Sequence, residues 1–185
     1  MTRSLKLIVV VLLMVLTKTT VNAQRVAVTS NVLEDVLLMP NVGVDFVVAD
    51  NQSIAFDATI APYKISSKLH NKNLTFRASY KYWFSQAFYA HYIGADVVAS
   101  STDLLISSLN LRSEYVGVGV SYGYSFVLGT RLNLVPHVGV GIAYGNNYEG
   151  YDQMLKPGEG VEAVTYPSFR PIVTRLGITL QYILR

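Results

Sequence analysis

The chain contains no cysteine, and only 15% of its 185 residues are charged. Without cysteine it can form neither a disulfide framework nor a zinc–thiolate site, and it offers no catalytic thiol. The scarcity of Asp, Glu, Lys and Arg is unusual for a protein surrounded by water, because a soluble surface alone carries about a quarter or more of charged residues. A small disulfide-stapled secreted domain and a thiol enzyme are therefore excluded.

No apolar run is long enough for a transmembrane helix, which needs about 20 residues. The most hydrophobic stretch extends from Leu5 to Leu16, follows Arg3 and is interrupted by Lys6. Small residues follow it and end at Ala23. A basic start, a short apolar core and a small-residue end are typical of a secretory signal. We therefore expect residues 1–23 to be a cleaved signal peptide and residues 24–185 to form one domain.

The positive charge of the whole chain belongs to this predicted signal. The chain has 15 basic and 12 acidic residues, and Arg3, Lys6 and Lys18 lie within residues 1–23, so 15 minus 3 leaves 12 basic residues against 12 acidic ones. A neutral mature chain has no basic surface, and we expect no binding to nucleic acid. Export without disulfides is in keeping with the bacterial cell envelope.

Helical periodicity is nearly absent after the predicted signal. Apolar residues instead recur at every second position, which is typical of strands with two different faces. Eight such segments are found at 25–33, 41–49, 53–63, 73–84, 88–99, 114–127, 131–145 and 171–184. Short turns at 50–52, 85–87 and 128–130 alternate with longer loops at 34–40, 64–72, 100–113 and 146–170. The pattern predicts an all-β, eight-stranded antiparallel transmembrane β-barrel, an up-and-down meander with short periplasmic turns.

One face of the predicted strands is apolar, and the other carries the polar residues. The polar face includes three acids, three bases and one histidine: Asp45, Asp57, Asp96, Arg77, Lys81, Arg175 and His137. A buried charge without a partner costs several kcal/mol, so equal numbers of acids and bases favour a confined lumen over a solvated surface. We predict that these residues form a polar network inside the barrel and that the apolar face meets lipid.

Aromatic residues gather at one end of the apolar face. The stretch SYKYWFSQAFYAHY at 79–92 holds many of them. We predict an aromatic girdle at the periplasmic border of the membrane, formed by Tyr80, Tyr82, Phe84, Phe88, Tyr89, Tyr122, Tyr124, Phe126 and Tyr182. Aromatic rings are favourable where lipid meets water. The charges lie on the opposite face, which argues against a platform that stacks bases.

Two glycine-rich segments, VGVGVSYGYS at 116–125 and VGVGIAYGNN at 138–147, resemble each other. Their third glycine comes one position too late for a dinucleotide fingerprint, and the alternation continues through both segments. We expect these glycines to face the lumen and to leave room for the side chains of Arg77, Lys81 and Trp83.

No constellation of residues points to catalysis or metal binding. His70, His91 and His137 lie in separate segments without metal-ligand spacing, so we predict no metal, no cofactor and no enzyme activity. Two alternatives stay open. One is an outer-membrane enzyme that modifies lipid, although His91 has no suitably placed serine; the other is a soluble, lipocalin-like carrier with an apolar interior. The carboxylates of the loop 146–170 leave calcium or sugar binding open as well.

Two stretches carry a resemblance to a known family: NVLEDVLLMPNVGVDF at 31–46 and RASYKYWFSQAFYAHYIGADV at 77–97. They contain Asn31 and Leu33 before the first loop, and an Arg-x-x-Tyr-x-x-Trp-Phe motif that is followed by His91 and Gly94. In these features the chain resembles a family of small outer-membrane β-barrels of unknown function, found mainly in Bacteroidetes and often encoded near fimbrial genes. The resemblance implies a place in the outer membrane and a link with fimbriae or surface attachment.

These observations together predict a structural or binding protein of the envelope that acts through its extracellular loops. An eight-stranded barrel is filled by its own side chains, so we expect no general diffusion pore. The expected partners are outer-membrane lipid, the barrel-assembly machinery, and surface or fimbrial proteins or glycans contacted by the loops 100–113 and 146–170.

Overall fold

A computed structural model describes residues 25–66, 69–106, 109–151 and 168–184 of the chain. The predicted signal peptide at 1–23 lies outside these residues. In chain order the elements are β1 (Val26–Asn31), α2 (Val32–Val36), β2 (Asn41–Ala49), β3 (Gln52–Ser66), β4 (Leu69–Trp83), β5 (Ala90–Ile106), β6 (Leu109–Val127), β7 (Leu132–Tyr151) and β8 (Ser168–Leu184).

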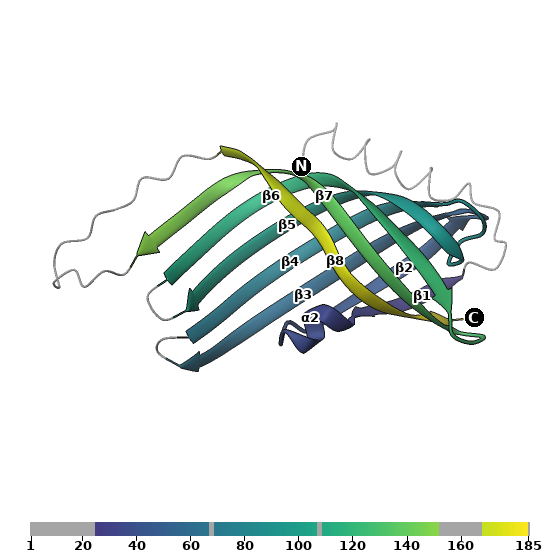
Figure 1. Cartoon of the computed structure of the whole chain (residues 1–185), viewed down its shortest axis with the longest axis horizontal. Helices are drawn as coiled ribbons and strands as arrows, with labels where there is room; N and C mark the ends of the chain where they lie inside the picture. The colour runs from purple at the N-terminus through teal and green to yellow at the C-terminus, as the bar shows by residue number, and fades with distance from the viewer. Residues whose placement is uncertain (1–24, 67–68, 107–108, 152–167, 185) are drawn as a thin grey trace, which may run out of the picture.

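The strands form an antiparallel meander that closes into a ring (Figure 1). Each strand pairs with its neighbours in sequence, and β1 pairs with β8 to complete the circle. The predicted all-β, eight-stranded, up-and-down fold is confirmed.

The strands are staggered around the ring. A row of paired residues leaves β8 at Tyr182 and passes through Val28, Val44, Phe56, Ala78, Val97, Val118 and Ile142. It returns to β8 at Pro171, which is 11 positions from where it began (182 minus 171). A stagger of this kind tilts every strand relative to the axis of the ring. Every member of the row is apolar or aromatic, so the apolar face continues around the whole ring.

The strands are longer than the sequence predicted at one end of the ring. The predicted loops 64–72 and 100–113 are largely strand, because β3 and β4 reach Ser66 and Leu69 while β5 and β6 reach Ile106 and Leu109. The two-residue apolar period is not regular in these segments, although the backbone pairing continues. The predicted loop 146–170 is also strand up to Tyr151, and 152–167 lie outside the described residues.

The predicted first loop, 34–40, begins inside a short helix. β1 ends at Asn31, and the Asn31 side chain caps α2 by accepting a hydrogen bond from the Leu33 N–H at 3.2 Å. Glu34 and Asp35 in the first turn are favourable at the positive end of a helix. Five residues are too few to show a helical period, which is why the sequence predicted a loop. None of the described residues belongs to a helix with the length and apolarity needed to cross a membrane.

The glycines of the two repeats make room for residues other than those predicted. A Cβ on Gly119 would lie 2.6 Å from Thr174 Cγ2, and one on Gly117 would lie 2.9 Å from Ile172 Cδ1. A Cβ on Gly123 would meet the ring of Tyr92. These glycines therefore leave space for the side chains of Ile172 and Thr174 on β8 and for the ring of Tyr92. Arg77, Lys81 and Trp83 are not among the nearest neighbours of the three glycines.

Replacing Gly119 with Ala should destabilise the folded state by about 1–3 kcal/mol, as expected for overpacking. The added Cβ would lie 2.5 Å from the Val140 carbonyl oxygen and 3.0 Å from Gly141 Cα, and neither backbone atom can move aside cheaply. Gly129→Ala is the matched control, because nothing lies within 4 Å of its added Cβ. Urea unfolding of the refolded variants measures both. Equal losses would contradict the close packing at the repeats.

Candidate functional site

An ionic layer fills the middle of the ring. Lys81 Nζ lies 2.6 Å from Asp45 Oδ2, with both side chains almost fully buried. Arg175 forms an ion pair with Asp57, and its Nε lies 3.5 Å from Asp96 Oδ1. Residues from five strands thus neutralise one another inside the fold, which removes most of the cost of burying them.

A β-bulge allows β8 to contribute twice to this layer. The register between β7 and β8 shifts between Gly139 and Val140, so the neighbours Thr174 and Arg175 are both buried. Asp96 receives hydrogen bonds from Ser79 Oγ at 2.5 Å and from Thr174 Oγ1 at 3.5 Å. The alternation of the sequence pattern does not reveal this bulge, and Thr174 was not among the predicted lumen residues.

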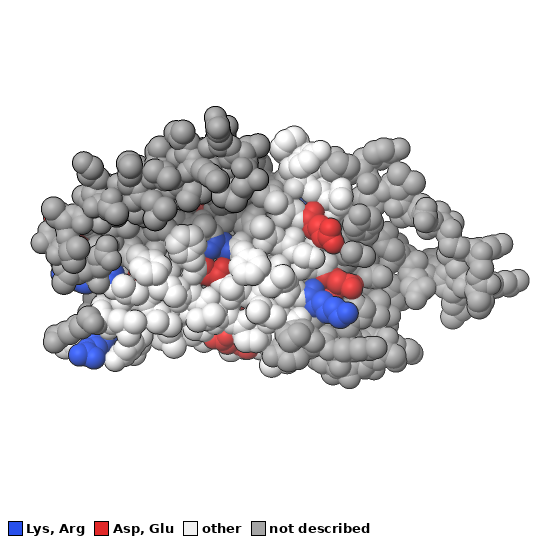
Figure 2. Space-filling view, turned by 180° about the vertical axis from the view of Figure 1, so that it is seen from behind, with Lys and Arg blue, Asp and Glu red and all other residues white. Residues whose placement is uncertain are grey.

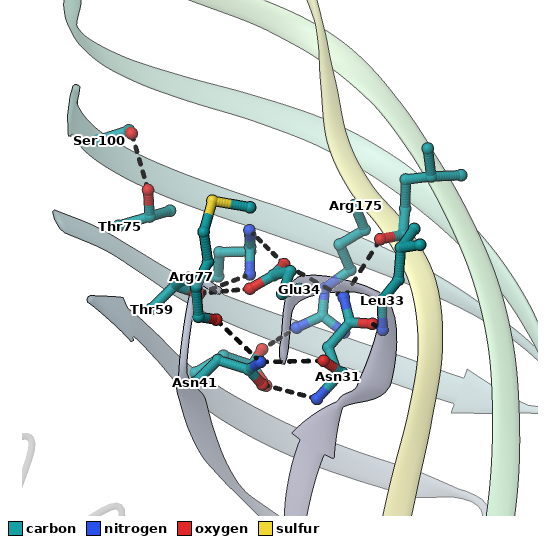
Figure 3. A network of polar contacts seen from close by, with 12 residues as sticks. Asn31, Leu33, Glu34, Asn41, Thr59, Thr75, Arg77, Ser100 and Arg175 are labelled. Carbon is teal, nitrogen blue, oxygen red and sulfur yellow. Dashed lines mark hydrogen bonds and ion pairs between the residues drawn. The ribbon is translucent and has the colours of Figure 1, made fainter. Parts of the chain in front are cut away.

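Glu34, which α2 points into the ring, was also not among the predicted lumen residues (Figure 3). Glu34 Oε1 lies 2.9 Å from Arg77 Nη2 and 3.1 Å from Asn31 Nδ2, while Oε2 accepts a 2.6 Å hydrogen bond from Thr59 Oγ1. Arg77 is therefore paired with Glu34, and the predicted balance of three acids and three bases becomes four acids and three bases. The signal that could have found Glu34 is its place three residues after the helix cap, as in a capping box.

His137 is also buried, as are Asp45, Lys81, Asp96 and Arg175, whereas Asp57 and Arg77 are half-buried. His137 Nδ1 lies 3.1 Å from the carbonyl oxygen of Val135 and 3.4 Å from Thr179 Oγ1. The structure thus brings all seven predicted network residues to the inside of the ring.

An aromatic cluster closes the interior next to the short turns. The rings of Trp83 and Tyr92 have centroids 4.8 Å apart, and Phe88 packs edge-on against Trp83 at 5.9 Å. The indole Nε1 of Trp83 donates a 3.0 Å hydrogen bond to Ser53 Oγ, so the buried polar atom is satisfied. Ala27, Ala87 and Val135 complete the cluster.

Phe88 differs from its prediction, which placed it in the outer girdle. It is only 3% exposed and lies in the inner cluster. The connection between β4 and β5 is longer than the predicted turn 85–87, and Phe88 has a φ of 71°, so strand alternation no longer decides where its ring points. Ser125 Oγ and Asn133 Nδ2 each donate a 2.8 Å hydrogen bond to its carbonyl oxygen and hold this conformation.

The other eight predicted girdle residues lie at the outer surface. Seven are exposed, namely Tyr80, Tyr82, Phe84, Tyr89, Tyr122, Phe126 and Tyr182. Tyr124 is half-buried between the rings of His91 and Phe126, each with a centroid 4.5 Å away. His91 also contacts the Tyr122 hydroxyl through Nδ1, so it is part of an aromatic stack on the outside.

The outer surface forms an apolar belt, which we define by the outward-facing apolar and aromatic residues of the eight strands. The outward positions of β6 from Val116 to Phe126 and of β7 from Leu132 to Tyr144 are all apolar or aromatic. Figure 2 shows the same character as a broad uncharged area with only a few charged groups. At the height of the belt the ionic layer therefore lies inside, and the outward side chains of β6 and β7 are apolar or aromatic.

Little space remains between the side chains of the ionic layer and those of the aromatic cluster. The cavity lined by Lys81, Tyr92, His137 and Arg175 has a volume of about 10 Å³. This is room for about one water molecule. In this region the interior is a plug of side chains and does not form a channel. No group of three or more His, Asp or Glu side chains among the described residues could hold a metal ion.

The polar network extends to the point where β1 leaves the sheet (Figure 3). The Asn31 side chain accepts a hydrogen bond from the Ile178 N–H and donates one to the Leu176 carbonyl, both at 3.2 Å. The amide of Asn41 binds both backbone groups of Asn31, at 2.6 and 3.0 Å. Two asparagine side chains therefore continue the backbone pairing where β1 ends and β2 begins.

Replacing Asn31 with Ala should destabilise the fold by about 1–2 kcal/mol, because the helix cap is lost. Asn31→Asp separates the two roles of this residue. Asp is as good a cap as Asn, but it cannot donate to the Leu176 carbonyl and it would repel Glu34. We expect no rescue by Asp in urea unfolding. Full rescue would mean that Asn31 acts only as a helix cap.

A family model described as "Protein of unknown function (DUF3575)" matches residues 8–184. The chain belongs to this family. The DUF3575 match covers every strand of the ring. No curated protein and no solved structure matches the chain. Membership in DUF3575 agrees with the resemblance to a family of unknown function, while the link with Bacteroidetes, the outer membrane and fimbriae stays a prediction.

Proposed function

We propose that this DUF3575 protein is an integral β-barrel of the bacterial outer membrane, with a lumen plugged by its own side chains. The apolar belt is the observation that carries this proposal. A face of this size without charge is unfavourable in water, and large exposed apolar surfaces of soluble proteins mark contact with a partner or a membrane.

The height of the belt suits a membrane of this kind. On β6 the uninterrupted outward run from Val116 to Phe126 spans 10 residue steps (126 minus 116). At about 3.3 Å per residue and a strand tilt of about 40°, this run covers about 25 Å along the axis. The apolar band of outer-membrane barrels is about 25 Å tall.

The distribution of charge argues against a soluble, lipocalin-like carrier. Such a carrier needs an apolar interior for its ligand and a charged exterior for water. Here Lys81, Asp45, Asp96 and Arg175 are inside, and the exposed side chains of β6 and β7 are apolar. Polar inside and apolar outside is the arrangement of a membrane barrel.

The role we propose is structural or binding, without enzyme activity, and it is exercised by the hairpins at the end opposite the aromatic cluster. There β4, β5 and β6 carry the row Lys72, Asp103 and Arg112, which would stand above the lipid. Surface or fimbrial proteins, or glycans, are the partners we propose for these hairpins and for the segment 146–170. Insertion would depend on the barrel-assembly machinery.

Fractionation of the cell envelope tests the location. We expect the mature chain in the outer membrane, with heat-modifiable migration on gels because a closed barrel stays folded in detergent until heated. Recovery as a soluble periplasmic monomer would overturn the proposal. Unchanged lipid A in a deletion strain is the result we expect for a protein that is not a lipid-modifying enzyme.

A further inference from the structure

The ring has a seam, because β1 and β2 are much shorter than the strands beside them. β1 has 6 residues and β2 has 9, whereas β3 has 15 and β8 has 17. On β3 the last hydrogen bond toward β2 runs from the Ile60 N–H to the Pro40 carbonyl, at 3.0 Å. Beyond this point the described residues place no strand between residues 61–66 of β3 and residues 168–175 of β8. We call these two facing edges the seam; α2 lies at its base.

Prolines stand on both edges of the seam. The Ile60 N–H points toward β2, so the next residue that faces the same side is Pro62. On β8 the bulge shifts the alternation by one residue, and Pro171 faces the seam. Proline has no N–H to donate, and on edge strands it prevents another strand from pairing. The seam is therefore unsuited to an added β-strand, and its occupant must be of another kind.

The two sides of the seam differ in chemistry. On the outside, α2 and the residues after it present apolar side chains: Val36, Leu37 and Leu38 are 72%, 58% and 60% exposed. On the inside, β4 and β5 carry a row of hydroxyl and amide groups, formed by Asn73, Thr75, Ser100 and Thr102.

Within this row the Thr75 and Ser100 hydroxyls lie 2.7 Å apart. Figure 3 draws this pair together with Glu34 and Arg77. Asn73 Nδ2 donates a 3.0 Å hydrogen bond to Thr102 Oγ1. The Arg77 Nε is buried without a hydrogen-bond partner. The row groups hydrogen-bond to one another, and the second N–H of the Asn73 amide and the Arg77 Nε remain for a polar head group with oxygen acceptors.

We propose that the seam holds one membrane lipid sideways. The hydroxyl-bearing head group hydrogen-bonds to Asn73, Thr75, Ser100 and Thr102 inside the ring, and an acyl chain stays outside against Val36, Leu37 and Leu38. This inference rests on the proposed membrane location and adds a ligand and a site to it.

The test compares two lipids with the same acyl chains. The mature protein is reconstituted into vesicles of phosphatidylglycerol, whose head group carries hydroxyls, or of phosphatidylcholine, whose head group carries none. After extraction into mild detergent, native mass spectrometry counts the retained lipid. We expect one phosphatidylglycerol per chain and at least a roughly tenfold lower retention of phosphatidylcholine, in line with the loss of paired polar groups.

The variants locate the site. The double variant Thr75→Val, Ser100→Ala removes the hydroxyl row with little change in volume and should reduce retention about tenfold. Leu37→Ser with Leu38→Ser removes the outer contact at exposed positions, where we expect little loss of stability, and it should also reduce retention. Ser121→Ala is the control, because this buried hydroxyl on β6 has no hydrogen-bond partner and lies outside the row.

Two results overturn different statements. If the wild-type protein does not float with vesicles, the membrane location fails and the seam proposal fails with it. If the protein floats, but retains both lipids equally or loses nothing in the two double variants, only the seam proposal fails.

Discussion

Replacing Val120 with Lys is expected to destabilise the protein folded in lipid vesicles by about 2–4 kcal/mol. Val120 lies on β6 in the middle of the apolar belt, and its side chain is 65% exposed. In lipid the ammonium group would be placed near the middle of the bilayer, where solvation is poor. Urea titration of folding into phosphatidylcholine vesicles measures the change.

Ser101→Lys is the matched control for Val120→Lys. Ser101 also faces outward, but it lies at the upper border of the belt, two residues before Asp103. A charge near the membrane interface costs only about 0–1 kcal/mol. A large difference between the two variants supports a lipid-facing belt. Small and equal effects are what a water-exposed face would give, and they would contradict the account.

Replacing Lys81 with Met should destabilise the folded protein by about 3–5 kcal/mol, the second large effect. Lys81 is the ion-pair partner of Asp45, whose side chain is completely buried. Met fills a similar volume, so the main loss is the compensation of the Asp45 charge. Equilibrium unfolding in urea at neutral pH measures this change.

The double variant Asp45→Asn, Lys81→Met separates charge from packing. Removing both charges takes away the unpaired carboxylate, and we expect the double variant to recover most of the stability that Lys81→Met loses. If the double variant is as unstable as the single one, the loss arises from packing. A cost below about 1 kcal/mol for Lys81→Met would show that Asp45 is solvated, which contradicts a plugged lumen.

The fold was largely predictable because a strand with two different faces leaves a period of two in the sequence. The run of Val116, Val118, Val120, Tyr122 and Phe126 shows this period plainly, and β6 is found there. The same alternation separates the inward-facing residues from those of the apolar belt. The alternation of inward and outward side chains is a geometric property of a regular strand, so it holds wherever the pairing is regular.

The predictions failed where the backbone is not a regular strand. Phe88 lies in a turn with positive φ, and Thr174 lies in a bulge, so neither follows the alternation of inward and outward side chains. Glu34 lies in the ionic layer because it is carried by a helix of only five residues, too short to be predicted. These features depend on contacts between distant segments, such as the hydrogen bonds from Ser125 and Asn133 to the Phe88 carbonyl, and no local pattern contains them.

The extended hairpins show a related limit. In the extended hairpins polar cross-strand pairs, such as Lys72 with Asp103, stand among apolar ones, such as Leu69 with Ile106, and no regular alternation marks the strands. The predicted segments therefore end where the apolar belt ends, although the strands themselves continue. The proposed binding role belongs to the part of the strands that this pattern does not detect.

The chain has one tryptophan, and this makes a direct test of the apolar belt possible. Trp83 lies inside the ring, so vesicles with brominated acyl chains should leave the emission of the native protein nearly unchanged. In a Trp83→Phe background, Val118→Trp places the fluorophore on the belt, and brominated lipid should quench most of its emission. Quenching at position 118 without quenching at position 83 is the result we predict. Unquenched emission from position 118 would contradict a lipid-facing belt.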